Sequence, residues 1–164
     1  METILIKASY DDKSVIRKLL ELYIYDFSEF DKSDVNKHGE YGYERLDCYW
    51  IEEGRYPFLI KTDGNISGFA FIRICEENKI TINSIAEYFI LKKYRKMNIG
   101  KNIATQIFDQ FKGKWNVSVL ESNIPAFSFW EKTIKEFTDG NYKIIKKDDW
   151  EGPIFEFESK GSNV

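Results

Sequence analysis

The segment from Lys92 to Lys101 concentrates positive charge, since five of its ten residues are Lys or Arg. It follows an apolar stretch that ends at Leu91, and Gly100 opens a run whose apolar residues recur at helical spacing. A strand, a turn and a helix in this order leave the first backbone N–H groups of the helix unpaired, and the helix dipole adds positive potential there. We therefore predict that the segment binds a phosphate or pyrophosphate. A solvated, charged turn is the alternative.

Glu87 is the candidate for proton transfer. Strand alternation between Thr81 and Leu91 predicts that four residues share one face, namely Ile85, Glu87, Phe89 and Leu91. A carboxyl group among apolar side chains has a raised pKa and can take a proton from an amine, directly or through water. An exposed carboxylate without a role is the alternative.

Two motifs resemble the signatures of the GNAT superfamily of acyl-CoA N-acyltransferases. Residues 95–100 read Arg-Lys-Met-Asn-Ile-Gly, which is similar to the family pattern Arg/Gln-x-x-Gly-x-Gly/Ala. Residues 123–130 read Asn-Ile-Pro-Ala-Phe-Ser-Phe-Trp, which is similar to Asn-x-x-Ala-x-x-Phe-Tyr and follows the next strand, as in the family. The element order from Thr3 to Glu158 also follows the family, so the resemblance covers nearly the whole chain.

The resemblance implies an α/β fold with a mixed, mostly antiparallel sheet that splays and is flanked by helices. It implies transfer of an acetyl group from acetyl-CoA to a primary amine of a small molecule or peptide, by direct attack in a ternary complex without a metal. Glu87 would be the base, loop amides would hold the pyrophosphate, and a backbone N–H near Ile90 would polarise the thioester. The implied acetyl-CoA site comprises Phe89, Ile90, Leu91, Arg95, Lys96, Met97, Asn98, Ile99, Gly100, Lys101, Asn123, Phe129 and Trp130.

Within that site, Phe89, Ile90 and Leu91 would offer backbone groups at the free edge of a strand to the pantetheine amides. Asn123 would hydrogen-bond the same arm. Phe129 and Trp130 would pack along it, or they are plain core residues.

The sequence departs from the family at two positions. Asn98 stands where the family has its first Gly, and Asn tolerates the left-handed φ that such a turn needs. Its side chain would donate to a phosphate oxygen or point to solvent. Trp130 replaces the family Tyr that is proposed to protonate the departing thiolate, and an indole N–H does not ionise at neutral pH. The acid is therefore missing or not needed, because a thiol of pKa about 8.5 leaves readily as thiolate.

The remaining elements follow from periodicity and turn residues. Expected helices run from Asp12 to about Asp26, from about Glu44 to Glu53, from Gly100 to a stop at Gly113, and from Pro125 onward. Expected strands are residues 3–9, 58–61, 67–74, 81–91, 115–119, 142–146 and 154–157. Alternation of helices and strands predicts a mixed sheet with helices on its faces.

Composition excludes several other classes of protein. The 164 residues predict one domain over 1–164, and a net charge of −3 argues against a nucleic-acid or membrane binder. Cys48, Cys75 and His38 are too few for a zinc site. Without a signal peptide or membrane-spanning stretch, we expect a cytoplasmic protein, monomer or homodimer, with reduced thiols.

The irregular segment from Asp26 to Tyr56 is the candidate for substrate specificity. It carries nine Asp or Glu against four Lys or Arg, a net of −5, and seven aromatic residues. Such a surface suits a cationic amine, whereas a solvated loop with core-filling rings is the alternative. Two other functions remain open at this point. One is an acyl-CoA-binding module without turnover, and the other is a nucleic-acid patch at Lys92 to Lys101.

Overall fold

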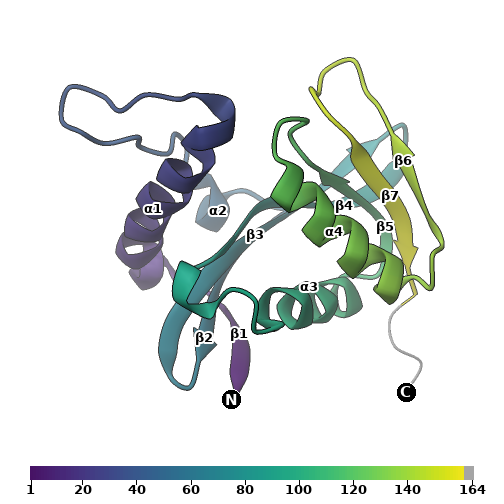
Figure 1. Cartoon of the computed structure of the whole chain (residues 1–164), viewed down its shortest axis with the longest axis horizontal. Coiled ribbons are helices and arrows are strands. Elements are labelled where there is room, and N and C mark those ends of the chain that lie inside the picture. The colour runs from purple at the N-terminus through teal and green to yellow at the C-terminus, as the bar shows by residue number, and fades with distance from the viewer. Residues whose placement is uncertain (161–164) are drawn as a thin grey trace.

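The computed structural model describes residues 1–160 and arranges them as one mixed sheet with helices on both faces (Figure 1). The strand order is β1-β2-β3-β4-β5-β7-β6. The strands are β1 (Thr3–Lys7), β2 (Arg55–Thr62), β3 (Asn65–Glu77), β4 (Ile80–Ile90), β5 (Gly113–Ser118), β6 (Tyr142–Ile145) and β7 (Ile154–Ser159). The helices are α1 (Lys13–Asp31), α2 (Cys48–Ile51), α3 (Ile99–Gln110) and α4 (Ile124–Phe137), with 3-10 turns at Tyr10–Asp12 and Lys92–Tyr94.

Each face of the sheet has its own hydrophobic core. Helices α3 and α4 cover one face, where Ile103 and Phe108 from α3 and Ile134 from α4 are fully buried. Helices α1 and α2 cover the other face, where Ile16 and Tyr49 pack on the sheet. The predicted α/β architecture is therefore confirmed, and all strand pairs are antiparallel within residues 1–160 except β4 with β5.

Two helices differ in length from the sequence prediction. Helix α1 runs to Asp31, five residues beyond the predicted end, and stops where Lys32 adopts a left-handed φ of 60°. Helix α2 is only the four residues Cys48–Ile51, because the chain turns back through Gly54 to begin β2. The longer α1 matters for the site, since its last two turns reach across to the loop before α3.

The sheet opens between β4 and β5. These parallel strands pair only from Ile82 to Ser84 on β4 and from Lys114 to Asn116 on β5. Beyond Ser84, β4 continues to Ile90 beside β3 alone, so its other edge faces a gap. The predicted splay is thus present, and it leaves backbone polar groups of β4 free to pair with a ligand.

A bulge in β4 corrects one prediction about side-chain direction. Phe71 on β3 pairs with Glu87, whereas its neighbour Ile72 pairs with Ile85, so Ala86 has no partner. The extra residue shifts the alternation by one position. Ile85 therefore packs on the α3 and α4 side, while Glu87 and Phe89 face α1 and α2. The expectation that Ile85 shares a face with Glu87 was wrong.

Candidate active site

A cavity of about 620 Å³ lies between the end of α1, the open edge of β4 and the first turns of α3 and α4. Ten of the predicted acetyl-CoA residues line it, namely Phe89, Ile90, Arg95, Lys96, Asn98, Gly100, Lys101, Asn123, Phe129 and Trp130. The predicted Leu91, Met97 and Ile99 lie off its wall, Ile99 because its side chain is buried in the core. The two motifs, which are about 25 residues apart in the sequence, therefore line the same cavity.

The loop before α3 turns through two left-handed residues. Asn98 has a φ of 61° and Lys96 a φ of 62°. The tolerance of Asn98 for this conformation is thus confirmed, while the same strain at Lys96 was not expected. The turn brings the chain into α3 so that the unpaired N–H groups of its first turn meet the cavity at Gly100.

Arg95 ties this loop to α1 and to β4. Its Nε donates to the carbonyl of Ile90 at 2.8 Å, and its second amino group pairs with Asp26 at 2.5 Å. Lys92 contacts the same carboxylate at 3.1 Å. Burial alone would raise the pKa of Asp26, but hydrogen bonds from Arg95 and Lys92 outweigh it and lower the pKa. Arg95 therefore holds the cavity wall in place and also gives it a positive charge.

The other cations of the segment are distributed unevenly. Lys101 pairs with Glu136 on α4, and Lys93 lies over the ring of Tyr94 at 5.1 Å. Lys96 lines the cavity and makes no ion pair within residues 1–160. Of the cations in this segment that line the cavity, Lys96 is therefore the one without an ion pair in the described residues.

The backbone of β4 offers two residues to the gap. Leu91 N donates to Ser67 O on β3 at 2.9 Å, and alternation directs the polar groups of Phe89 to β3 as well. Those of Tyr88 and Ile90 point the other way. Because Arg95 holds the Ile90 carbonyl, the Ile90 N–H and both groups of Tyr88 are left facing the gap.

Asn123 begins α4 and is nearly buried. Its side-chain oxygen accepts a hydrogen bond from Ala126 N at 3.1 Å, which caps the helix ahead of the predicted Pro125 in the first turn. The amide NH₂ of Asn123 has no hydrogen-bond partner in the described residues and lies on the cavity wall. The capping bond fixes the orientation of this free donor.

Three aromatic rings form the floor of the cavity. Trp130 is only 6% exposed and meets the Tyr88 ring edge-on with centroids 5.0 Å apart. Phe129 lies 6.0 Å from Tyr88 in a stacked arrangement. The Tyr88 hydroxyl donates to Gly100 O at the start of α3. Trp130 also packs on Phe108, so it belongs to the core and to the wall at once.

Glu87 lies behind the wall rather than on it. Tyr43 Oη donates to Glu87 Oε1 at 3.1 Å, and Tyr23, which does line the cavity, faces the same carboxyl closely enough to lower its pKa. Burial raises the pKa of Glu87, although the two tyrosines oppose this shift. The predicted acidic group is thus present with the predicted direction of pKa shift, and Tyr23 stands between it and the cavity.

A loop anchored by Glu21 brings Tyr43 to Glu87. The Glu21 carboxylate accepts hydrogen bonds from Tyr41 N at 2.8 Å and Gly42 N at 2.7 Å. Glu21 and Tyr23 were not expected from the sequence, whereas Tyr43 and the wall residues Asp26, Phe27 and Phe30 were expected only as part of the segment from Asp26 to Tyr56 that was assigned to substrate specificity. The spacing of the α1 rings was a usable signal, because positions four and seven residues apart share a helix face.

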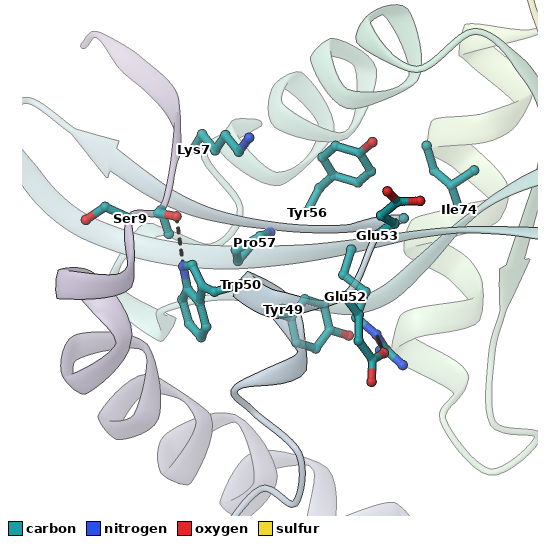
Figure 2. A pocket seen from close by; sticks show the side chains of 12 residues that line it. Lys7, Ser9, Tyr49, Trp50, Glu52, Glu53, Tyr56, Pro57 and Ile74 are labelled. Carbon is teal, nitrogen blue, oxygen red and sulfur yellow. Dashed lines mark hydrogen bonds and ion pairs between the residues drawn. The ribbon is translucent and has the colours of Figure 1, made fainter.

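A second, more open hollow of about 910 Å³ lies where β1 ends and β2 begins. Figure 2 shows its side chains around the start of β2, with Lys7 and Tyr56 on one side of the strand and Tyr49 and Trp50 on the other. Trp50 Nε1 donates to Ala8 O at 3.1 Å and holds this wall in place. None of its described lining residues belongs to the first cavity.

Comparisons with known proteins identify the family. The sequence model of the Acetyltransferase (GNAT) family matches residues 3–134. The chain therefore belongs to this family, and the protein is an acetyltransferase. No curated protein matches the sequence closely enough to add a relative. One domain over residues 1–164 stays a prediction, since the match ends at 134.

Solved structures share the fold at low sequence identity. An acetyltransferase from Thermus thermophilus is 10% identical with a TM-score of 0.74, and the alignment covers 96% of this chain and 97% of that one. The PaiA N-acetyltransferase of Thermoplasma acidophilum, solved with coenzyme A, is 14% identical with a TM-score of 0.68, covering 96% and 99%. The ribosomal-protein-S18-alanine N-acetyltransferase of Escherichia coli is 10% identical with a TM-score of 0.66, covering 99% and 97%.

Neither a metal-ion site nor a membrane-spanning helix is present in residues 1–160. No group of three or more His, Cys, Asp or Glu residues is placed to hold a metal ion there. Every helix in that part of the chain is too short or too polar to cross a bilayer.

Proposed function

We propose that the protein transfers an acetyl group from acetyl-CoA to a primary amine of a small molecule or peptide within a ternary complex. The observation that carries this proposal is one cavity that joins the start of α3 to the unpaired edge of β4. The first feature suits an anion and the second suits an amide chain. We place the reaction in the cytoplasm, because Cys48 and Cys75 are both free thiols.

The residues around the cavity fit the donor as a long molecule with an anionic end. The pyrophosphate would lie against the amides near Gly100 and the ammonium of Lys96. The pantetheine arm would pair with the Tyr88 and Ile90 backbone and the free amide of Asn123. The ion pairs made by Lys92, Arg95 and Lys101 weaken the alternative of a nucleic-acid patch.

When bound, acetyl-CoA supplies an acetyl group activated as a thioester. The amine nitrogen bonds to the carbonyl carbon as the carbon–sulfur bond breaks, and Glu87 takes the proton that the amine loses. We propose that this proton passes through Tyr23, whose oxygen receives it from the amine side while its own proton goes to Glu87. The Ile90 N–H would stabilise the negative charge on the carbonyl oxygen.

The acceptor would be a cationic amine. The wall beside Glu87 carries the rings of Tyr23 and Phe27, and Tyr43 lies on the same carboxyl. Aromatic faces attract an ammonium group, and the net −5 of the segment from Asp26 to Tyr56 adds to that attraction. The raised pKa of Glu87 makes it a stronger base toward the amine proton than an ordinary carboxylate.

The test is thiol release from acetyl-CoA with a panel of small amines and lysine peptides. The parent should turn over at least one of them, and Glu87→Gln should be slower by ~10²-fold with acetyl-CoA affinity within a few-fold by calorimetry. Glu40→Gln, on the exposed loop, is the matched control and should behave as the parent. If Glu87→Gln is as fast as the parent from about pH 6 to 9, another group is the base. Binding without any turnover would favour the acyl-CoA-binding module.

A further inference from the structure

Asp26 is the carboxylate that joins α1 to the loop before α3. Its Oδ2 accepts a hydrogen bond from the second amino group of Arg95 at 2.5 Å, and its Oδ1 pairs with the ammonium of Lys92 at 3.1 Å. Asp26 lies in the last two turns of α1, between Tyr23 and Phe30, which also line the first cavity. Both oxygens of this one carboxylate are therefore occupied by cations of the loop.

Three contacts fix the guanidinium of Arg95. Besides the bond to Asp26, Arg95 Nε donates to Ile90 O at 2.8 Å, and the guanidinium carbon lies 5.6 Å from the centre of the Phe89 ring. The guanidinium is planar and its donors point in fixed directions, so these contacts together define its orientation. Asp26 is the one charged partner of the three, and a hydrogen bond to an ionised acceptor is stronger than one to a neutral carbonyl.

Arg95 in turn determines which groups the open edge of β4 offers. Arg95 occupies the carbonyl of Ile90, so the N–H is the free backbone group of that residue in the gap. This N–H is the donor that the proposed function places on the thioester carbonyl oxygen. If Arg95 rotated away, Ile90 O could accept from the pantetheine amides and the donor could pair with β4 in a shifted register. A displacement of the reacting atoms by about 1 Å can lower the rate by about 10²-fold.

We propose that Asp26 is a positioning residue, which holds Arg95 on Ile90 O and thereby fixes the register of the acetyl donor along β4. The inference rests on the proposed function, because it concerns how acetyl-CoA lies in the site. A guanidinium binds phosphate oxygens as well as carboxylate oxygens, so a bound pyrophosphate would compete for Arg95. Asp26 keeps this cation on the β4 edge and leaves the phosphates to the α3 amides and Lys96.

Direct contact with a cationic acceptor is the other role that the place of Asp26 on the wall allows. Lys92 and Arg95 bring two positive charges to one carboxylate, so the cluster of these three residues keeps a net positive charge. Such a cluster repels an ammonium group rather than attracting it. The two roles affect different substrates, so kinetics with two donors and one acceptor separates them.

The test compares acetyl-CoA with acetyl-pantetheine, a donor that has no phosphates. Asp26→Ala should lower kcat/KM about tenfold with both donors and leave the KM of the amine unchanged, because the β4 edge holds the part that the donors share. Asp26→Asn keeps an oxygen for Arg95 and should lose no more than about threefold. Asp31→Ala is the matched control and should behave as the parent, since it removes an α1 carboxylate that bonds Ser33 away from the cavity wall.

Several results would overturn the inference. A loss in Asp26→Ala with acetyl-CoA alone, or a parent that does not use acetyl-pantetheine, would mean that the phosphates rather than the β4 edge determine how the donor lies. A kcat/KM within about twofold of the parent with both donors would show that Asp26 has no such role. A higher KM for the amine alone would assign Asp26 to the acceptor. An equal loss in Asp26→Asn or Asp31→Ala would indicate a damaged helix end instead of a lost Arg95 contact.

A failure of this inference can be distinguished from a failure of the proposed function. Should Asp26→Ala fail to fold, Arg95→Met with the same two donors tests the next member of the link and should show the same equal loss. A slow Glu87→Gln beside a normal Asp26→Ala would refute only the positioning role, whereas the reverse pattern would refute only the base. If the parent releases no thiol with any amine, the proposed function fails. Calorimetry with acetyl-pantetheine then tests Asp26, and Asp26→Ala should bind it about tenfold more weakly.

Discussion

Tyr43 Oη donates to Glu87 Oε1 at 3.1 Å, although the two residues are 44 positions apart in the chain. The contact joins an irregular loop to the only bulged segment of β4 within residues 1–160. It fixes the carboxyl group in a buried place where its ionised form is disfavoured by desolvation and supported by phenol donors. The chemistry proposed for Glu87 therefore depends on a residue outside both sequence motifs.

Gly100→Glu should weaken acetyl-CoA binding at least tenfold, about 1.4 kcal/mol. A Cβ at this position would lie 3.2 Å from Phe129 Cε2, so the longer side chain has to enter the cavity, where its charge repels a phosphate. Calorimetry measures the change. Gln106→Glu adds the same charge on the exposed face of α3 and should bind as the parent. If Gly100→Glu is folded and binds acetyl-CoA as tightly as the parent, the phosphate does not bind at this turn.

Trp130→Tyr should turn over no more than about threefold faster than Trp130→Phe, since a thiol of pKa about 8.5 leaves without an acid. The Phe variant is the control because both changes shrink the packing of the ring against Tyr88 and Phe108 equally. Steady-state thiol release gives both rates. A Tyr variant ten times faster than the Phe variant would show that a missing proton donor limits the parent.

Glu87→Gln should gain stability over the parent as pH rises. Burial raises the pKa of Glu87 in the folded protein, so the folded state binds this proton more tightly than the unfolded chain does. The stabilisation that this bound proton gives the folded state is present in full below the ordinary carboxyl pKa. It is lost as pH rises through the raised pKa of the folded protein. The variant cannot ionise, so its Tm minus that of the parent should be larger at about pH 8 than at about pH 4. A constant or falling difference would contradict the raised pKa.

Glu21→Ala should free the loop that carries Tyr43. Two backbone amides, those of Tyr41 and Gly42, would lose their carboxylate acceptor, and their hydrogen exchange should quicken by about tenfold or more. Turnover should also fall, because Tyr43 would no longer be held on Glu87. Glu40→Ala changes a charge in the same loop without removing an acceptor that the structure shows. Faster exchange in both variants would mean that Glu21 is not the anchor.

The sequence by itself determined most of the elements and the turn before α3. Apolar spacing predicted α3 and α4, alternation predicted the strands, and Asn98 before Gly100 predicted a left-handed turn into a helix. These features depend on residues within a few positions of one another, so local stereochemistry is enough to specify them. The end of α1 was placed too early, because Phe27 and Phe30 extend its apolar face into a segment that is otherwise polar.

Only the tertiary structure decided what surrounds Glu87. The bulge at Ala86 depends on how β3 and β4 pair, and it reversed the side on which Ile85 lies. Tyr43 meets Glu87, and Arg95 meets Asp26, across 44 and 69 positions respectively. Contacts at such separations leave no periodic signal in the chain, because they form only when packing of the whole sheet brings distant segments together. The motifs therefore specified the turn and the helix starts that line the cavity, and the fold specified which groups surround Glu87.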